Sequence, residues 1–166
     1  MGRFYKMNRD IYALAEAMLK NQELCKLIYY SGQHPLKQPD IDGVRQLLNK
    51  RVLPFRTKMP TPLEEKTYVM IRPENIRSSR GGNLIKSQLV FDIYTSEKDK
   101  IVYDKNNKSC NREMLIMDKI DGFMTSMEFS IGENDFTMAG TIETKNADFT
   151  GYSIIYNDVD FRKMSE

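Results

Sequence analysis

Histidine and cysteine carry much of the nucleophilic and metal chemistry of proteins, and this sequence has one histidine and two cysteines. A serine or cysteine nucleophile would need His34 as its base, but His34 lies in a Gly-Gln-His-Pro stretch that is typical of a surface turn. Cys25 falls on the apolar side of a helical pattern beside Leu24 and Ile28, which predicts a small buried hydrophobe. Cys25 and Cys110 form no C-x-x-C pair, so we expect no structural zinc, no disulfide scaffold and no cofactor.

One pair of acids has a spacing of chemical interest. Asp158 and Asp160 alternate with Val159 and Phe161 at the end of a predicted strand, so both carboxylates share one face. Two such groups can hold a divalent cation or share a proton, but no third ligand follows from the sequence, and a solvated strand end is the simpler explanation. The sequence also lacks the motifs of phosphate-binding loops, dinucleotide folds, serine hydrolases and zinc proteases. We therefore expect no enzyme and no catalytic or metal-binding residues.

Cations gather at one place, where Arg77, Arg80 and Lys86 flank Gly81 and Gly82. Glycine lets backbone N–H groups approach a phosphate closely, although such a composition is also typical of any exposed loop. The 25 Lys and Arg against 23 Asp and Glu leave a formal net charge of +2, which is too balanced for a protein that coats a polyanion. If the protein assembles around a channel that DNA passes through, these three cations are candidates for weak contact with that DNA. They are equally candidates for contact with a neighbouring subunit.

The proline-rich segment 53–66 is the second candidate contact region. Each of its three prolines removes a backbone N–H and biases the preceding residue toward extended geometry, which predicts a stretched surface arm without regular structure. An arm pre-set by proline loses little entropy when it docks on another subunit. Its candidate contact residues are Arg56, Lys58 and Met59.

Hydrophobic periodicity indicates the elements that position these residues. Apolar residues recur at helical spacing over 8–30, with Asn8 or Asp10 as the expected N-cap and Asn21 at a break. A weaker helical pattern covers 41–48 despite Gly43 inside it, and a helix over 111–124 has Ser109 or Asn111 as its expected cap. Strands are predicted over 67–72, 84–95, 127–131, 136–143 and 149–156. Leu89, Phe91 and Ile93 share one face of the second of these strands, and we expect the helix over 111–124 to cover that face with its apolar stripe of Ile116, Ile120 and Phe123.

This order of elements predicts one α+β domain over residues 1–166, a mostly antiparallel or mixed sheet with helices packed on one face. Two long connections are expected to project from it: a hairpin loop over 73–83 and a polar loop over 97–109. Apolar runs are far shorter than the ~20 residues of a membrane helix, and no apolar stretch near the first residue is typical of a secretion signal. We expect no membrane contact.

The closing strand over 149–156, with the pattern Phe-x-Gly-Tyr-x-Ile-x-Tyr, and the helix before it resemble those of tail terminator and tail-completion proteins of long-tailed bacteriophages. The resemblance implies a virion structural protein that caps the tail tube and joins it to the head as a hexameric ring. It further implies a tail tube protein and a head-completion or connector protein as partners, with the protein located in the virion tail or neck and in the host cytoplasm during assembly.

Two alternatives remain at this point. Head-tail adaptor and head-completion proteins from the same neck region are similar in size and equally poor in motifs. A nucleic-acid-binding module that uses the hairpin from Arg77 to Lys86 is the alternative from a different class.

Overall fold

The structure, a computed structural model, describes residues 2–56, 58, 64–78, 85–126, 136–144 and 146–160. The backbone alone is described for Arg3, Ser78, Ile85, Lys86, Phe136 and residues 158–160. The chain forms a single-domain α+β fold around a mixed sheet, which confirms the predicted fold class.

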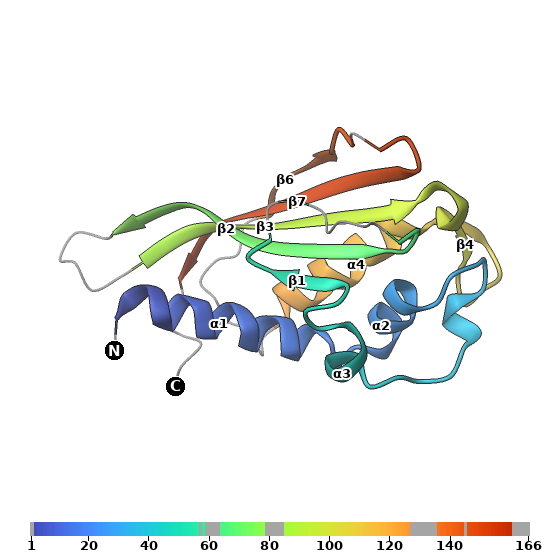
Figure 1. The fold of residues 1–166 in the computed structure, drawn as a ribbon, viewed down its shortest axis with the longest axis horizontal. Coiled ribbons are helices and arrows are strands. Elements are labelled where there is room, and N and C mark those ends of the chain that lie inside the picture. Colours follow the sequence, from blue (N-terminus) through green and yellow to red (C-terminus); the bar gives the residue numbers. More distant parts are fainter. Residues whose placement is uncertain are drawn as a thin grey trace.

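The main sheet has five strands in the order β1-β2-β3-β7-β6 (Figure 1). β1 pairs in parallel with β2, and the remaining neighbours, β2 with β3, β3 with β7 and β7 with β6, are antiparallel. The strands are β1 (Val52–Pro54), β2 (Tyr68–Ser78), β3 (Ile85–Ser96), β6 (Phe136–Thr141) and β7 (Phe149–Asp160). A separate two-stranded sheet joins β4 (Ile101–Tyr103) to β5 (Ser109–Asn111).

The helices lie together on one face of the main sheet (Figure 1). They are α1 (Arg3–Met18), α2 (Gln22–Tyr29), α3 (Gly43–Leu47) and α4 (Arg112–Thr125), with short 3-10 turns η1 (Pro35–Lys37) and η2 (Glu97–Asp99). Leu89, Phe91 and Ile93 alternate along β3 and are buried in the same core cluster as Ile116 and Ile120 of α4. The predicted packing of this helix stripe on that strand face is confirmed.

The start of α1 corrects one expectation, because the helix begins at Arg3 and neither Asn8 nor Asp10 caps it. Met7 is buried with Ile11 in the core, so the apolar stripe extends one turn N-terminal to Ile11, and the helix begins before Asn8. The break predicted at Asn21 is confirmed.

α3 covers the centre of the helix predicted over 41–48 and begins at Gly43 itself. The Asp42 side chain caps it by accepting a hydrogen bond from the Arg45 N–H at 3.0 Å. A Cβ at position 43 would lie 2.5 Å from both the Cys25 Sγ and the Leu19 carbonyl oxygen. Glycine therefore occupies this position because α3 starts in direct contact with the chain around α2.

The three predicted irregular segments contain more structure than expected. β2 continues through part of the predicted 73–83 loop as far as Ser78, across an irregularity between Glu74 and Arg77. β1 occupies the first residues of the predicted 53–66 arm, and η2, β4 and part of β5 occupy the predicted 97–109 loop. In each case a neighbouring strand supplies the backbone hydrogen bonds that the local sequence does not signal. The strand predicted over 127–131 lies outside the described residues.

Candidate functional site

The structure brings together two of the three predicted cations. Arg77 of β2 and Lys86 of β3 are direct register partners, and Lys86 is in turn the partner of Asp160 on β7. Arg77 is exposed, whereas Arg80 lies outside the described residues. Arg77 thus belongs to a paired strand and not to a loop, which corrects the predicted 73–83 connection, whereas Lys86 lies in β3, within the strand predicted over 84–95.

Part of the predicted 53–66 arm belongs to the sheet. Leu53 and Pro54 are buried in β1, whereas Arg56 and Lys58 are exposed. Met59 lies outside the described residues. The segment available for contact with another molecule therefore starts after β1.

The histidine, the buried cysteine and the acid pair singled out in the sequence lie among residues of the fold. The His34 ring stacks on Tyr103 with centroids 4.9 Å apart. The buried Cys25 donates from its Sγ to the Leu19 carbonyl oxygen at 3.0 Å, and burial raises the pKa of this thiol to about 12. Asp158 and Asp160 lie two positions apart in β7. Among the described residues, no group of three or more histidine, cysteine or carboxylate residues is placed to hold a metal ion.

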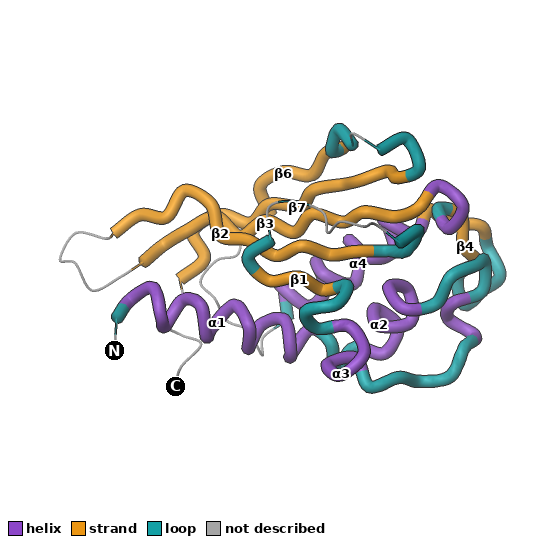
Figure 2. The backbone as a smooth tube through the Cα atoms, in the orientation of Figure 1, coloured by secondary structure: helices purple, strands orange, loops and turns teal. Residues whose placement is uncertain are grey.

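One end of the molecule presents apolar side chains to solvent. Phe4 and Tyr5 of α1 are 67% and 58% exposed, and Ile76 of β2 is 43% exposed. The N-terminal half of α1 and the free ends of β2 and β3 lie at the same end of the longest axis (Figure 1). In Figure 2 both strands extend past β1 toward this end. We call Phe4, Tyr5 and Ile76 the apolar end.

Arg112 is the polar centre of the fold. Its side chain is fully buried and donates four hydrogen bonds to main-chain carbonyls, Nε to Asp99, Nη1 to Leu27 and Tyr30, and Nη2 to Gly32, at 2.6 to 2.7 Å. These bonds tie the carbonyl end of α2 to η2 and to the start of α4. Burial lowers the pKa of the guanidinium, but arginine remains charged at neutral pH.

Arg51 meets the same end of α2 from the other side. Its Nη1 donates to the carbonyls of Ile28 and Tyr29 at 2.8 and 2.7 Å, and its guanidinium carbon lies 5.2 Å from the centre of the Tyr29 ring. A helix C-terminus leaves carbonyls without helical partners and carries partial negative charge, so both arginines complement it. Arg51 differs in being only half-buried, and burial lowers its pKa also.

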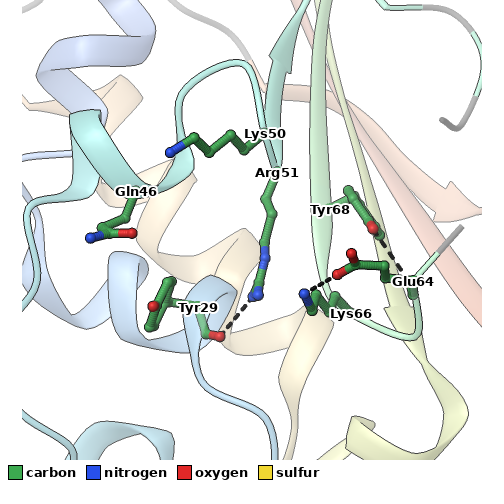
Figure 3. A pocket seen from close by; sticks show the side chains of 7 residues that line it. All are labelled: Tyr29, Gln46, Lys50, Arg51, Glu64, Lys66 and Tyr68. Atoms are coloured by element: carbon green, nitrogen blue, oxygen red, sulfur yellow. Dashed lines mark hydrogen bonds and ion pairs between the residues drawn. The ribbon is translucent and has the colours of Figure 1, made fainter.

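A pocket of about 360 Å³ opens beside Arg51 (Figure 3). Lys50 and Lys66 line it with Arg51, and the aromatic rings of Tyr29 and Tyr68 form part of its wall. Lys66 forms an ion pair with the adjacent Glu64 carboxylate. We call this site the Arg51 pocket.

A family comparison covers the fold from α2 to β7. The family model called YomW matches residues 21–157, from the cap of α2 to the last residues of β7. The chain belongs to the YomW family. The name is that of a protein from a Bacillus prophage, and the chain is accordingly phage-associated. A search of curated proteins found no match.

Both arginines and the whole Arg51 pocket fall inside the part that matches the YomW family, whereas α1 precedes it. Sequence reasoning missed all of them. Arg112 carried one signal, because a cation in the first turn of a helix opposes the helix dipole and so needs another reason to be there. No helix among the described segments of this YomW family chain is long and apolar enough to span a bilayer.

Proposed function

We propose that this chain is a virion structural protein, a tail terminator whose subunits form a hexameric ring that caps the phage tail tube and joins it to the head. Membership of a phage-associated family supports the viral setting. The observation that carries the proposal is the apolar end, where α1 and the β2–β3 ribbon present exposed aromatic and aliphatic side chains beyond the sheet.

A ring uses heterologous contacts, in which one surface of a subunit meets a different surface of the next. The apolar end suits such a contact, because exposed aromatic and aliphatic groups gain free energy when a neighbour covers them. Arg56 and Lys58, which are both exposed and follow β1, are further contact candidates. The partners of the ring are the tail tube protein and a head-completion or connector protein, in the virion and, before that, in the host cytoplasm.

Sedimentation of the purified full chain over a wide concentration range tests ring formation. We expect a concentration-dependent shift from monomer to hexamer, weakened by Ile76→Ser. Ile101→Ser is the matched control, because Ile101 is a strand isoleucine of similar exposure, 46% against 43%, and its strand β4 lies at the opposite end of the molecule (Figure 1). A strict monomer at every concentration, or equal effects of the two substitutions, would contradict the proposal.

A head-side completion protein is the alternative within the same neck region. Pull-down of the purified chain with isolated tail tubes and, separately, with emptied heads distinguishes the two, since a terminator requires capture by the tubes.

Arg77 and Lys86, register partners on β2 and β3, are only two cations. This small number favours weak contact with duplex DNA over a nucleic-acid-binding function. So few cations release few counterions, so we expect weak DNA binding that salt weakens further. Sub-micromolar, sequence-selective binding at ~150 mM salt would favour the nucleic-acid-binding module instead.

A further inference from the structure

The charge of Arg51 is incompletely matched. Its two hydrogen-bond acceptors are neutral carbonyls, and among the described residues no carboxylate lies within ion-pair distance of it. A half-buried cation has lost part of its hydration, and a full negative charge restores more of that loss than a carbonyl dipole does. The guanidinium therefore favours an anion beside it.

Arg51 retains the edge that recognises oxyanions. Only Nη1 is engaged, and within the described part of the chain Nε and Nη2 have no hydrogen-bond partner. Two parallel N–H groups of a guanidinium match the two oxygens of a carboxylate or phosphate. The contact with the Tyr29 ring and the two bonds to α2 hold the group in one orientation, so little entropy is lost when an anion binds.

The pocket adds positive charge around this edge. Arg51, Lys50 and Lys66 line it, and Glu64 is the one acid among its lining residues. The Glu64 side chain is 64% exposed and pairs with Lys66, so it neutralises one of the three cations. Lys50 donates to the Arg45 carbonyl at 2.8 Å, which leaves its ammonium charge unbalanced. In Figure 3 Arg51 lies between Tyr29 on one side and the Glu64–Lys66 pair on the other.

We propose that the Arg51 pocket binds the oxyanion group of a small molecule, a carboxylate or a phosphate, held by the free edge of Arg51 and by Lys66. The volume of about 360 Å³ falls within the range of small-molecule sites. The Glu64 carboxylate competes with the ligand for Lys66, and it releases Lys66 when the ligand binds. The inference does not depend on ring assembly, because every lining residue comes from one chain.

Calorimetric titration of the full chain at constant ionic strength tests the proposal, with inorganic phosphate and citrate as separate probes. We expect saturable binding of at least one probe with a Kd of about 1 mM. Tighter binding of phosphate identifies a phosphorylated ligand, and tighter binding of citrate identifies a carboxylate. Absence of saturable binding of either probe up to tenfold that concentration would overturn the proposal.

Two variants that leave Arg51 and its contacts with α2 in place give opposite expected results. Lys66→Gln removes a ligand contact and weakens binding about tenfold, the effect of losing one charge-assisted hydrogen bond. Glu64→Gln removes the competitor and tightens binding severalfold. Lys26→Gln is the matched control, because Lys26 also pairs with a carboxylate, that of Asp40, but lies outside the pocket. Equal effects of Lys66→Gln and Lys26→Gln would show general charge attraction and overturn the site.

Discussion

Two arginines meet the carbonyl end of α2 and differ in how many of their N–H groups are occupied. Arg112 is fully buried and uses four of its donors on carbonyl oxygens from three segments of the chain. Arg51 is half-buried and donates two bonds, both from one nitrogen. At the same helix end, Arg112 thus uses most of its N–H donors on carbonyls, whereas Arg51 leaves most of its N–H donors without a hydrogen bond among the described residues.

The difference separates a structural role from a binding role. Buried backbone carbonyls cost free energy unless they accept a hydrogen bond, and the fully buried Arg112 side chain satisfies two buried and two partly buried carbonyls. Arg51 satisfies two and retains donors beside a pocket that an anion can enter. The comparison predicts that substitutions at the two sites differ both in stability and in ligand binding.

The largest expected effect is that of Arg112→Met. The substitution removes the donor of four carbonyls, of which those of Leu27 and Asp99 lie in buried hydrogen bonds, so we expect a loss of unfolding free energy on the order of 3 to 5 kcal/mol. Urea unfolding followed by circular dichroism measures it. Arg112→Lys keeps the charge with fewer donors and should give an intermediate loss. A loss below about 1 kcal/mol would mean that Arg112 does not hold these segments together.

Arg51→Met should have a smaller effect on stability. Two carbonyls lose their donor at a position that water can reach, so we expect a loss of about 1 to 2 kcal/mol in the same urea experiment. The comparison fails if Arg51→Met destabilises the protein as much as Arg112→Met does.

The opposite end of α2 provides a third measurement. Asn21 caps it by accepting a hydrogen bond from the Leu24 N–H at 3.1 Å, and Asn21→Ala should lower the unfolding free energy by about 1 kcal/mol. Asn111→Ala is the control, because Asn111 caps α4 in the same way through the Met114 N–H at 3.0 Å. A much larger loss at Asn21 alone would show that α2 is held from its N-terminus and not by the two arginines.

At neutral pH the smallest expected effect is that of Cys25 in α2, because its thiol changes stability only at alkaline pH. The thiol keeps its proton in the folded protein up to a pKa of about 12, whereas in the unfolded chain it loses the proton near its ordinary value of 9.0. The unfolded state is therefore favoured progressively as pH rises from about 9 toward 12.

Cys25→Ala should make the fall of unfolding free energy shallower over that pH range, as measured by urea unfolding at a series of pH values. Cys110→Ala is the control for loss of a thiol that is only partly buried. If the unfolding free energy fell equally steeply with pH in the parent protein and in both variants, the burial of the Cys25 thiol would be contradicted.

Local pattern was enough to predict much of the secondary structure from the sequence. The spacing of apolar residues predicted α2 and α4, and Asn21 and Asn111 cap them as expected. The alternation of Leu89, Phe91 and Ile93 predicted which face of β3 meets a helix. The side chains of a helix or strand return to the same face every two to four residues, so a short stretch of sequence by itself contains this information.

The tertiary structure alone decided the strand extensions and the Arg51 pocket. β2 runs on to Ser78 because β3 offers backbone partners there, and β1 exists because it lies beside β2. The pocket joins Tyr29, Arg51 and Lys66, which come from three different segments of the chain. The partners of a guanidinium are carbonyls that every residue possesses, so nothing in the side-chain sequence marks which of them Arg51 or Arg112 will meet.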